Sequence, residues 1–197
     1  MSKGMTAKGA ATRRRIVVAA ALLIREKGAA ETTLDDVRAA TSTSKSQLFH
    51  YFPNGRTDML VAVAQHEAEQ VLQAQRPYLD DLSSWEAWQK WSRAVLDHYT
   101  ELGRRCPLGS LTTELGKTSA EAGAVVTGLF ETWEAALARG VEAMLPGDGS
   151  PADRARVVLT AVQGGALMLQ TTGRTDYLEA ALAAAIEPLR APAEVRG

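Results

Sequence analysis

The sequence predicts an all-α protein of about nine helices, and three observations lead to this fold class. Apolar residues recur at intervals of three and four along most of the 197 residues, as on one face of a helix. Serine or threonine followed three positions later by an acidic or amide residue precedes several of these segments, and such pairs cap helix N-termini. No stretch of useful length alternates apolar and polar residues, so no half-buried strand is expected.

The first helix is predicted from Thr12 to a stop at Gly28, after an arm over residues 1–9 that is expected to be disordered. A glycine directly after the last apolar position is a common helix stop. The apolar face of this helix comprises Ile16, Ala19, Ala20, Leu23 and Ile24.

Two short helices joined by a tight turn are predicted next. Thr33 and Asp36 form the capping box that opens one helix, and Ser44 and Gln47 form the box that opens the other. Residues 41–44 supply the turn between them. Two short helices in this arrangement are a helix-turn-helix signature.

Six further helices complete the prediction. The clearest start is Ser150-Pro-Ala-Asp153, because proline is favoured at the first helical position and an acidic residue is favoured in the first turn. The six helices are expected over residues 57–75, 83–102, 108–115, 118–145, 150–171 and 175–189.

The composition excludes several classes of protein. A single cysteine excludes an intrachain disulfide framework, and the three histidines are not at metal-ligand spacing. No apolar stretch approaches the roughly 18 residues of a membrane span, and the basic N-terminus lacks the apolar core of a signal peptide. No serine, cysteine or carboxylate arrangement typical of a hydrolase is present. We therefore expect a soluble cytoplasmic protein that is not an enzyme, with no cofactor, no metal and no membrane partner.

The charge is distributed unevenly along the chain. Residues 1–57 hold ten Lys and Arg against four Asp and Glu, a net charge of +6, whereas the remaining residues carry −7. We expect two domains, residues 1–56 and residues 57–197, of which the first faces a polyanion. On charge alone, a basic segment that is merely solvated remains the alternative.

The third predicted helix begins with residues suited to reading DNA. Small polar residues let a helix approach the major groove, Gln47 can pair with adenine, and Lys45 can donate to guanine or to a phosphate. Leu48, Phe49 and Phe52 are expected to form its apolar back face. The other reading is that these polar residues are helix caps and solvated positions. The candidate DNA-binding residues, with the expected phosphate contacts included, are Arg13, Arg14, Thr33, Thr43, Ser44, Lys45, Ser46, Gln47, His50, Tyr51 and Arg56.

Residues 12–60 resemble the DNA-binding segment of the TetR (tetracycline-repressor) family. The matching stretches are Thr12-Arg-Arg-Arg-Ile16, Thr32-Thr-Leu-Asp-Asp-Val37 and Ser44-Lys-Ser-Gln-Leu-Phe-His-Tyr-Phe52. The resemblance implies that the first three helices form a reading head and that the third is the recognition helix. It also implies that the family's contact positions are taken by Lys45, Gln47, His50 and Tyr51.

The chain departs from the family pattern at four positions. Ser42 stands where the family commonly has a turn glycine, and Arg56 stands where it usually has lysine. Thr43 replaces a small aliphatic residue, and Arg38 replaces alanine. These changes can alter the geometry of the turn or add a phosphate contact, but they leave the pattern intact.

The later part of the chain resembles one branch of the same family. Cys106-Pro-Leu-Gly-Ser-Leu111, followed by Glu114 and Leu115, is similar to the regulatory domain of LmrA- and YxaF-like repressors. The resemblance implies that the fourth to seventh helices surround a ligand cavity and that the last two long helices form a four-helix dimer interface. Both of these helices have a face of small and apolar residues that fits a homodimer, although burial within one chain is the alternative. The first face comprises Val158, Ala161, Val162, Gly165 and Leu169, and the second comprises Leu178, Leu182, Ala185 and Ile186.

Large apolar residues are the candidates for lining a ligand cavity. Any one aromatic residue at helical spacing is more often core than ligand contact, but together they favour an apolar or flat aromatic effector. Cys106, beside Arg104 and Arg105, is expected to have a packing role, with redox sensing as the alternative. The candidate ligand-binding residues are Trp88, Trp91, Leu108, Leu111, Phe130, Trp133 and Met168.

These observations together predict a transcriptional regulator that responds to a ligand. We expect a repressor that binds a palindromic double-stranded DNA operator as a homodimer and is released by a small-molecule effector. The alternative is an architectural DNA-binding protein that has no sequence preference and no effector.

Overall fold

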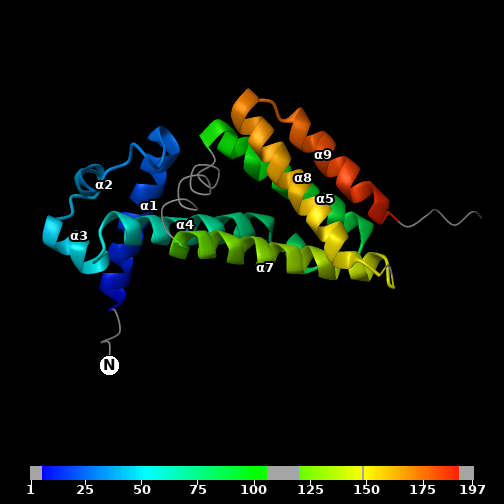
Figure 1. Cartoon of the computed structure of the whole chain (residues 1–197), viewed down its shortest axis with the longest axis horizontal. Helices are drawn as coiled ribbons and strands as arrows, with labels where there is room; N and C mark the ends of the chain where they lie inside the picture. Colours follow the sequence, from blue (N-terminus) through cyan, green and yellow to red (C-terminus); the bar gives the residue numbers. More distant parts are fainter. Residues whose placement is uncertain (1–5, 106–119, 148, 191–197) are drawn as a thin grey trace, which may run out of the picture. The chain divides into compact units, whose positions relative to one another are not determined.

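The computed structural model describes residues 6–105, 120–147 and 149–190 (Figure 1). Within these ranges the chain forms eight α-helices and no strand, so the all-α prediction is confirmed and the expected count of about nine is close. The helix expected over residues 108–115 lies outside the described residues. The helices are α1 (Ala7–Lys27), α2 (Leu34–Thr41), α3 (Lys45–Tyr51), α4 (Arg56–Gln75), α5 (Trp85–Leu102), α7 (Ala120–Met144), α8 (Pro151–Thr172) and α9 (Asp176–Ile186).

The chain divides into two compact units. Of the described residues, the first unit contains 6–69 and 120–127, and the second contains 70–105, 128–147 and 149–190. Helices α4 and α7 therefore contribute residues to both units. The expected domain boundary at residue 56 coincides with the first residue of α4.

Helix α1 begins earlier than the sequence predicts. Thr6 is its N-cap, and the Thr6 hydroxyl accepts a hydrogen bond from the backbone N–H of Gly9 at 3.2 Å. Residues 7–9 are therefore helical, and their assignment to a disordered arm was wrong. The predicted end is confirmed, because Gly28 follows the helix with a φ of +88°, which glycine adopts at no steric cost.

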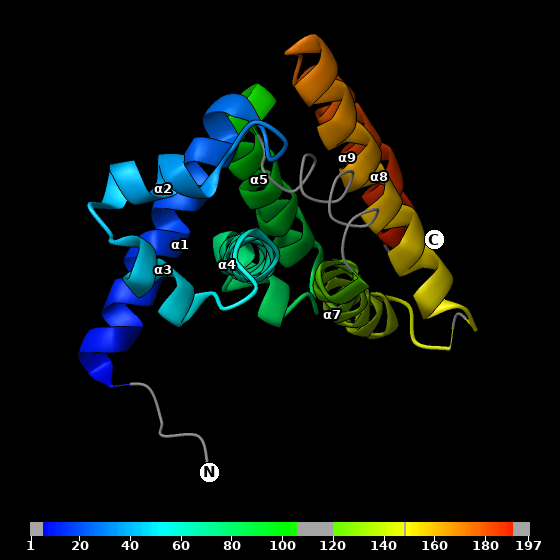
Figure 2. The ribbon, with the colours of Figure 1, turned by 60° about the vertical axis from the view of Figure 1, so that its left-hand side comes forward.

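The first unit has one apolar core, to which α1, α2, α3 and α4 all contribute. Ile16 of α1, Val37 of α2 and Leu48 of α3 are fully buried in it, as are Met59 and Val63 of α4. Figure 2 shows α2 and α3 as two short helices beside α1. Both begin at the capping residues that the sequence predicts, Thr33 and Ser44.

The turn between α2 and α3 uses an unusual residue. Ser42 follows α2 with a φ of +50°, in the left-handed region that favours glycine. Its backbone N–H donates to the carbonyl of Ala39 at 3.4 Å, and the N–H of Thr43 donates to the carbonyl of Arg38 at 3.1 Å. Serine therefore takes the conformation that the family pattern assigns to glycine.

Helices α8 and α9 pack side by side in the second unit (Figure 1). A Cβ atom at Gly165 would lie 2.6 Å from the Cα of Leu178, so only glycine permits this approach. Val158, Val162 and Leu182 are fully buried. The apolar faces predicted for dimerisation are thus largely buried within one chain, and this part of the prediction was wrong in its choice of face.

Three helix termini in the second unit differ slightly from the sequence prediction. Ser84 caps α5 in place of Ser83, because its hydroxyl accepts the N–H of Ala87 at 3.2 Å. The Ser150 hydroxyl donates to the Asp153 carboxylate at 2.7 Å and caps no backbone group of α8. Helix α9 ends at Ile186, and a 3-10 turn over Glu187–Leu189 follows. Among the described residues, no helix combines the length and apolar character needed to cross a membrane.

Candidate nucleic-acid interface

Helix α3 presents a short row of exposed polar side chains at its start. Ser44 is the N-cap, and its hydroxyl accepts the backbone N–H of Gln47 at 3.1 Å. Lys45, Ser46 and Gln47 are all exposed, whereas Leu48 is fully buried beneath them. The buried leucine fixes the helix on the core while the polar residues stay free to contact a partner.

The end of α3 carries two aromatic side chains. His50 is exposed and Tyr51 is half-buried, and their ring centroids lie 5.0 Å apart in an edge-to-face contact. Tyr51 also packs against the core of the first unit. The pair therefore has one side chain accessible to solvent and one that anchors it.

Thr43 does not join this surface. Its side chain is buried, and its hydroxyl lies 2.7 Å from the Thr41 hydroxyl in a hydrogen bond. The Thr41 hydroxyl in turn donates to the carbonyl of Val37 at 2.7 Å. The sequence prediction included Thr43 among the DNA contacts, but in the structure it holds the turn together.

Phe49 lies at the surface, which the sequence analysis missed. It was expected in the apolar back face of α3, but its side chain is 40% exposed. A Cβ atom on Gly55 would lie 3.3 Å from the ring, so the ring rests near that turn. Phe49 follows Lys45 by four residues and Ser46 by three, and residues at this spacing share one side of a helix. This spacing is the signal that could have placed Phe49 at the surface.

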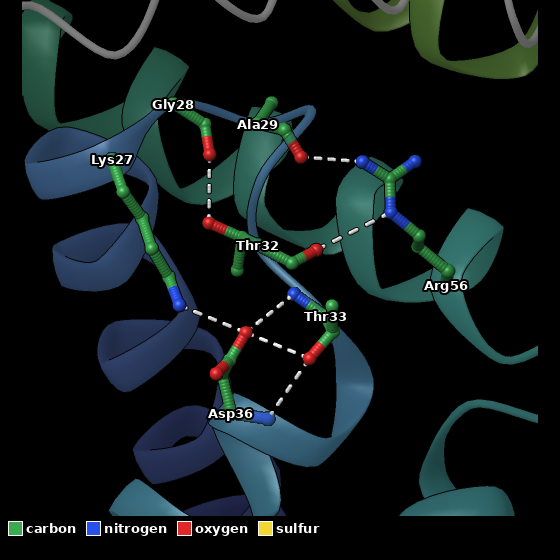
Figure 3. A network of polar contacts seen from close by, with 7 residues as sticks. All are labelled: Lys27, Gly28, Ala29, Thr32, Thr33, Asp36 and Arg56. Atoms are coloured by element: carbon green, nitrogen blue, oxygen red, sulfur yellow. Dashed lines mark hydrogen bonds and ion pairs between the residues drawn. The ribbon is translucent and has the colours of Figure 1, made fainter.

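The N-terminus of α2 is held by a closed set of polar contacts (Figure 3). The Asp36 carboxylate accepts the backbone N–H of Thr33 at 2.9 Å, and the Thr33 hydroxyl accepts the N–H of Asp36 at 3.1 Å. Lys27 of α1 pairs with the same carboxylate at 2.9 Å. The hydrogen bonds from Lys27 and then from Thr33 hold the pKa of Asp36 well below its ordinary value.

Arg56 is bound to the loop before α2. Its Nε donates to the carbonyl of Thr32 at 3.4 Å, and its Nη2 donates to the carbonyl of Ala29 (Figure 3). The side chain is half-buried. The sequence prediction gave Arg56 a phosphate as its partner, whereas the structure gives it two backbone carbonyls.

The arginines of α1 differ in their surroundings. Arg14 and Arg15 are exposed. Arg13 is half-buried, with its guanidinium carbon 5.4 Å from the centre of the Phe52 ring, a cation–π contact. Arg14 is thus accessible to a phosphate, and Arg13 is partly engaged with the core.

The predicted ligand-binding residues separate into three groups. Trp88, Trp91 and Trp133 are fully buried, and the Nε1 of Trp91 donates to the side-chain oxygen of Gln75 at 2.7 Å. Met168 is exposed on α8. Leu108 and Leu111, like Cys106, lie outside the described residues. The three tryptophans are thus buried within the second unit, and their contact with a ligand stays a prediction.

Phe130 lines a shallow hollow between α7 and α8. The hollow has a volume of about 350 Å³, and Leu159, Thr160 and Gln163 line it with Phe130. An ion pair of 3.0 Å between Arg156 and Glu134 closes one part of its rim. Of the predicted ligand-binding residues, Phe130 is the one that lines this hollow.

Two family models match the chain. The model for bacterial regulatory proteins of the tetR family matches residues 16–63. The model for the C-terminal domain of LmrA/YxaF-like transcriptional regulators matches residues 85–184. An HTH-type transcriptional regulator of Mycobacterium tuberculosis strain H37Rv is 30% identical over 164 residues, which cover 76% of this chain and 79% of that protein. The chain belongs to the TetR family.

A further relative and two solved structures are also similar to the chain, the structures in their fold. The HTH-type regulator YxaF of Bacillus subtilis is 26% identical to this TetR-family protein over 116 residues, 57% of this chain and 61% of YxaF. A TetR-family regulator of Cytophaga hutchinsonii shares the fold, with a TM-score of 0.78, 19% identity and coverage of 96% of this chain and 100% of its own. The regulatory protein TetR of Rhodobacter sphaeroides also shares the fold, with a TM-score of 0.73 and 22% identity. The match covers 87% of this chain and 95% of that protein.

The family assignment establishes the general function. This TetR-family protein is a transcriptional regulator whose first unit carries a helix-turn-helix DNA-binding domain. The family and its relatives are transcriptional regulators and not enzymes, as the sequence predicts. The helix-turn-helix comprises α2 and α3.

Proposed function

We propose that this TetR-family regulator is a repressor that binds a palindromic operator as a homodimer and is released by a small apolar or aromatic effector. The observation that carries the proposal is the row of exposed Lys45, Ser46 and Gln47 above the buried Leu48. A recognition helix needs this combination of polar residues at its start and an apolar anchor behind them.

Some exposed residues of the first unit are proposed to contact DNA bases, and others are proposed to contact phosphates. Gln47 is suited to adenine and Lys45 to guanine or a phosphate. Arg14 is exposed on α1 and is suited to a phosphate. The hydroxyl and backbone N–H of Thr33 both donate to the Asp36 carboxylate, so at this position the N-terminal end of α2 is proposed as the phosphate contact. His50 and Tyr51 lie at the end of α3, where a recognition helix passes the sugar-phosphate backbone. Ser44 and Ser46 supply small side chains that allow close approach.

The homodimer is proposed through the outer faces of α8 and α9. Val157 and Leu167 of α8 are 59% and 61% exposed, and Met168 and Tyr177 are also large apolar side chains at the surface. The exposed Gly164 lies between Val157 and Leu167 on α8. Burying such a surface against a second copy would pair two reading heads, as a palindrome requires.

The effector is proposed to enter the second unit. The hollow beside Phe130 has the minimum volume of a small-molecule site, and carbon atoms dominate its lining. The arginine–glutamate pair at its rim, Arg156 with Glu134, supplies polar contacts. An effector relieves repression only if it binds the DNA-free conformation more tightly than the DNA-bound one.

In vitro selection of random duplex DNA tests the proposal directly. We expect an enriched palindrome with half-sites about one helical turn apart, and Gln47→Ala is expected to relax the preference at one base pair by about 1–3 kcal/mol. Lys90→Ala, which removes an exposed lysine of α5 in the second unit, is the matched control and should bind as the unaltered protein does. Recovery of unrelated, salt-sensitive sequences would favour an architectural DNA-binding protein.

A further inference from the structure

The guanidinium of Arg56 donates hydrogen bonds to two backbone carbonyls of one loop. Arg56 is the first residue of α4, and its Nε and Nη2 donate to the carbonyls of Thr32 and Ala29 in the loop between α1 and α2 (Figure 3). These two donors lie on one edge of a rigid planar group. An ammonium group in the same place has three N–H donors but lacks the planar fork, so it meets the two carbonyls with poorer geometry.

The two carbonyls belong to buried residues. Ala29 and Thr32 are both fully buried, and a buried carbonyl requires a hydrogen-bond partner. The Thr32 hydroxyl donates to the carbonyl of Gly28 at 2.7 Å, which ties the loop to the end of α1. The Ala29 carbonyl also accepts the backbone N–H of Thr32 at 3.4 Å. Arg56 thus supplies a charged donor to the two buried positions of this loop, whose intervening residues 30–31 are exposed.

The same loop sets the position of the start of α2. Thr33 follows Thr32 directly and caps α2 through its reciprocal contacts with Asp36, which Lys27 of α1 also holds. A displacement of Ala29 and Thr32 therefore displaces Thr33 and with it the N-terminus of α2, the proposed phosphate contact. Lys27 and Arg56 hold this segment from two different helices.

We propose that Arg56 is a positioning residue for DNA binding. It holds the Ala29–Thr32 loop, and through it Thr33 and the N-terminus of α2, and it does not itself neutralise a DNA phosphate. A phosphate would have to displace, or share the guanidinium with, the two carbonyls that already occupy one edge of it. This inference rests on the proposed operator binding and changes the part that Arg56 plays in it.

The salt dependence of operator binding distinguishes the two roles. Each phosphate contact adds about 0.9 to the slope of log affinity against log salt concentration. We expect Arg56→Met to weaken binding about tenfold with an unchanged slope, because one hydrogen bond from a charged donor is worth about that factor. The matched variant Arg14→Met also removes one positive charge from the first unit, at an exposed position, and should lower the slope by about one.

The conservative variant sharpens the test. Arg56→Lys keeps the charge but loses the planar fork, so we expect it to recover only part of the operator affinity lost in Arg56→Met, with an unchanged slope. A lowered slope in Arg56→Met, together with recovery of slope and affinity in Arg56→Lys, would overturn the proposal and make Arg56 a phosphate contact. Unaltered operator affinity in Arg56→Met, with only a lower unfolding midpoint in urea, would also overturn it, because the side chain would then be structural alone.

Amide hydrogen exchange of the DNA-free protein gives an independent readout. We expect the backbone N–H groups of Thr33 and Asp36 to exchange about tenfold faster in Arg56→Met, with residues 45–51 unchanged. Unchanged exchange at these two amides would overturn the proposal. If the unaltered protein selects no duplex sequence, the proposed operator binding fails, and the exchange result still decides whether Arg56 holds the loop.

Discussion

Single residues of the first unit show how a small reading head is held in shape. Thr33, Asp36 and Lys27 form one polar cluster at the start of α2, and Thr41 and Thr43 form another at its end. Within each cluster the threonines bond to residues two to four positions away, and in the first cluster Lys27 also joins the end of α1 to the start of α2. The apolar core beneath them buries side chains of all four helices, and these contacts hold the two ends of α2.

The depressed pKa of Asp36 predicts a pH dependence of folding. Its ordinary pKa is 3.8, and the lowered value in the folded protein means that the ionised carboxylate stabilises the native state. This contribution is present above about pH 4 and is lost as the pH falls through the folded pKa. The difference in unfolding free energy between the unaltered protein and Asp36→Asn should therefore be largest near neutral pH and shrink below pH 4. Urea unfolding across this range measures it, and a constant difference would contradict the prediction.

A second residue-scale prediction concerns a buried carboxylate. Glu67 of α4 is almost fully buried and accepts hydrogen bonds from Nη2 of Arg25 at 3.1 and 2.9 Å. Glu67→Gln should lower the free energy of unfolding by about 2 kcal/mol. This loss is smaller than the loss expected for breaking a fully buried ion pair, because Arg25 is partly exposed. Arg25→Lys keeps the charge pair and should cost less. A loss under about 0.5 kcal/mol in urea unfolding of Glu67→Gln would argue against this role.

At the scale of helices, the sequence predicts elements well where the signal is local. The capping residues Thr33 and Ser44 predict the starts of α2 and α3, because each bonds to a group three residues away. The start of α1 is missed, since Thr6 precedes a segment of glycine and alanine with no apolar repeat. The burial of Thr43 and the partners of Arg56 depend on residues distant in sequence or on the shape of a turn, and no local pattern contains them.

The contact between α8 and α9 gives a prediction at this scale. Gly165→Ala would bring a Cβ to 2.6 Å from a backbone atom of Leu178, so the helices must separate. We expect a loss of about 2 kcal/mol or more, as for overpacked cores. Gly128→Ala on α7, where the added Cβ meets nothing within 4 Å, should instead gain up to about 1 kcal/mol from helix propensity. Equal effects of the two changes in urea unfolding would refute this account.

For the whole molecule, the family and the fold can be read from the sequence, but the outer surface cannot. The apolar faces of α8 and α9 that the sequence offers for dimerisation are turned inward, and the exposed set includes Val157, Leu167 and Tyr177. Helical periodicity identifies an apolar face without showing which partner covers it. The three tryptophans predicted to line a cavity are fully buried, and their contact with a ligand stays a prediction.

The proposed dimer is tested by one substitution on this surface. Leu167→Lys should convert the dimer to a monomer, because a charged residue would be buried without a partner. It should also abolish binding to a palindrome while leaving the helix content unchanged. Leu22→Lys, at a 52% exposed leucine of α1, is the matched control and should stay dimeric. Light scattering coupled to size-exclusion chromatography measures the mass, and a dimeric Leu167→Lys would place the interface elsewhere.

The missing side chain at Gly165 also limits how the last two helices can move. With the backbone of Leu178 seated at that position, sliding α9 along α8 by one turn would press it against Ala161 or Leu169, which have side chains. The register of the pair is therefore fixed by steric exclusion, in addition to apolar attraction. During any change of conformation, α8 and α9 should travel together as one stiff hairpin and transmit displacement without absorbing it.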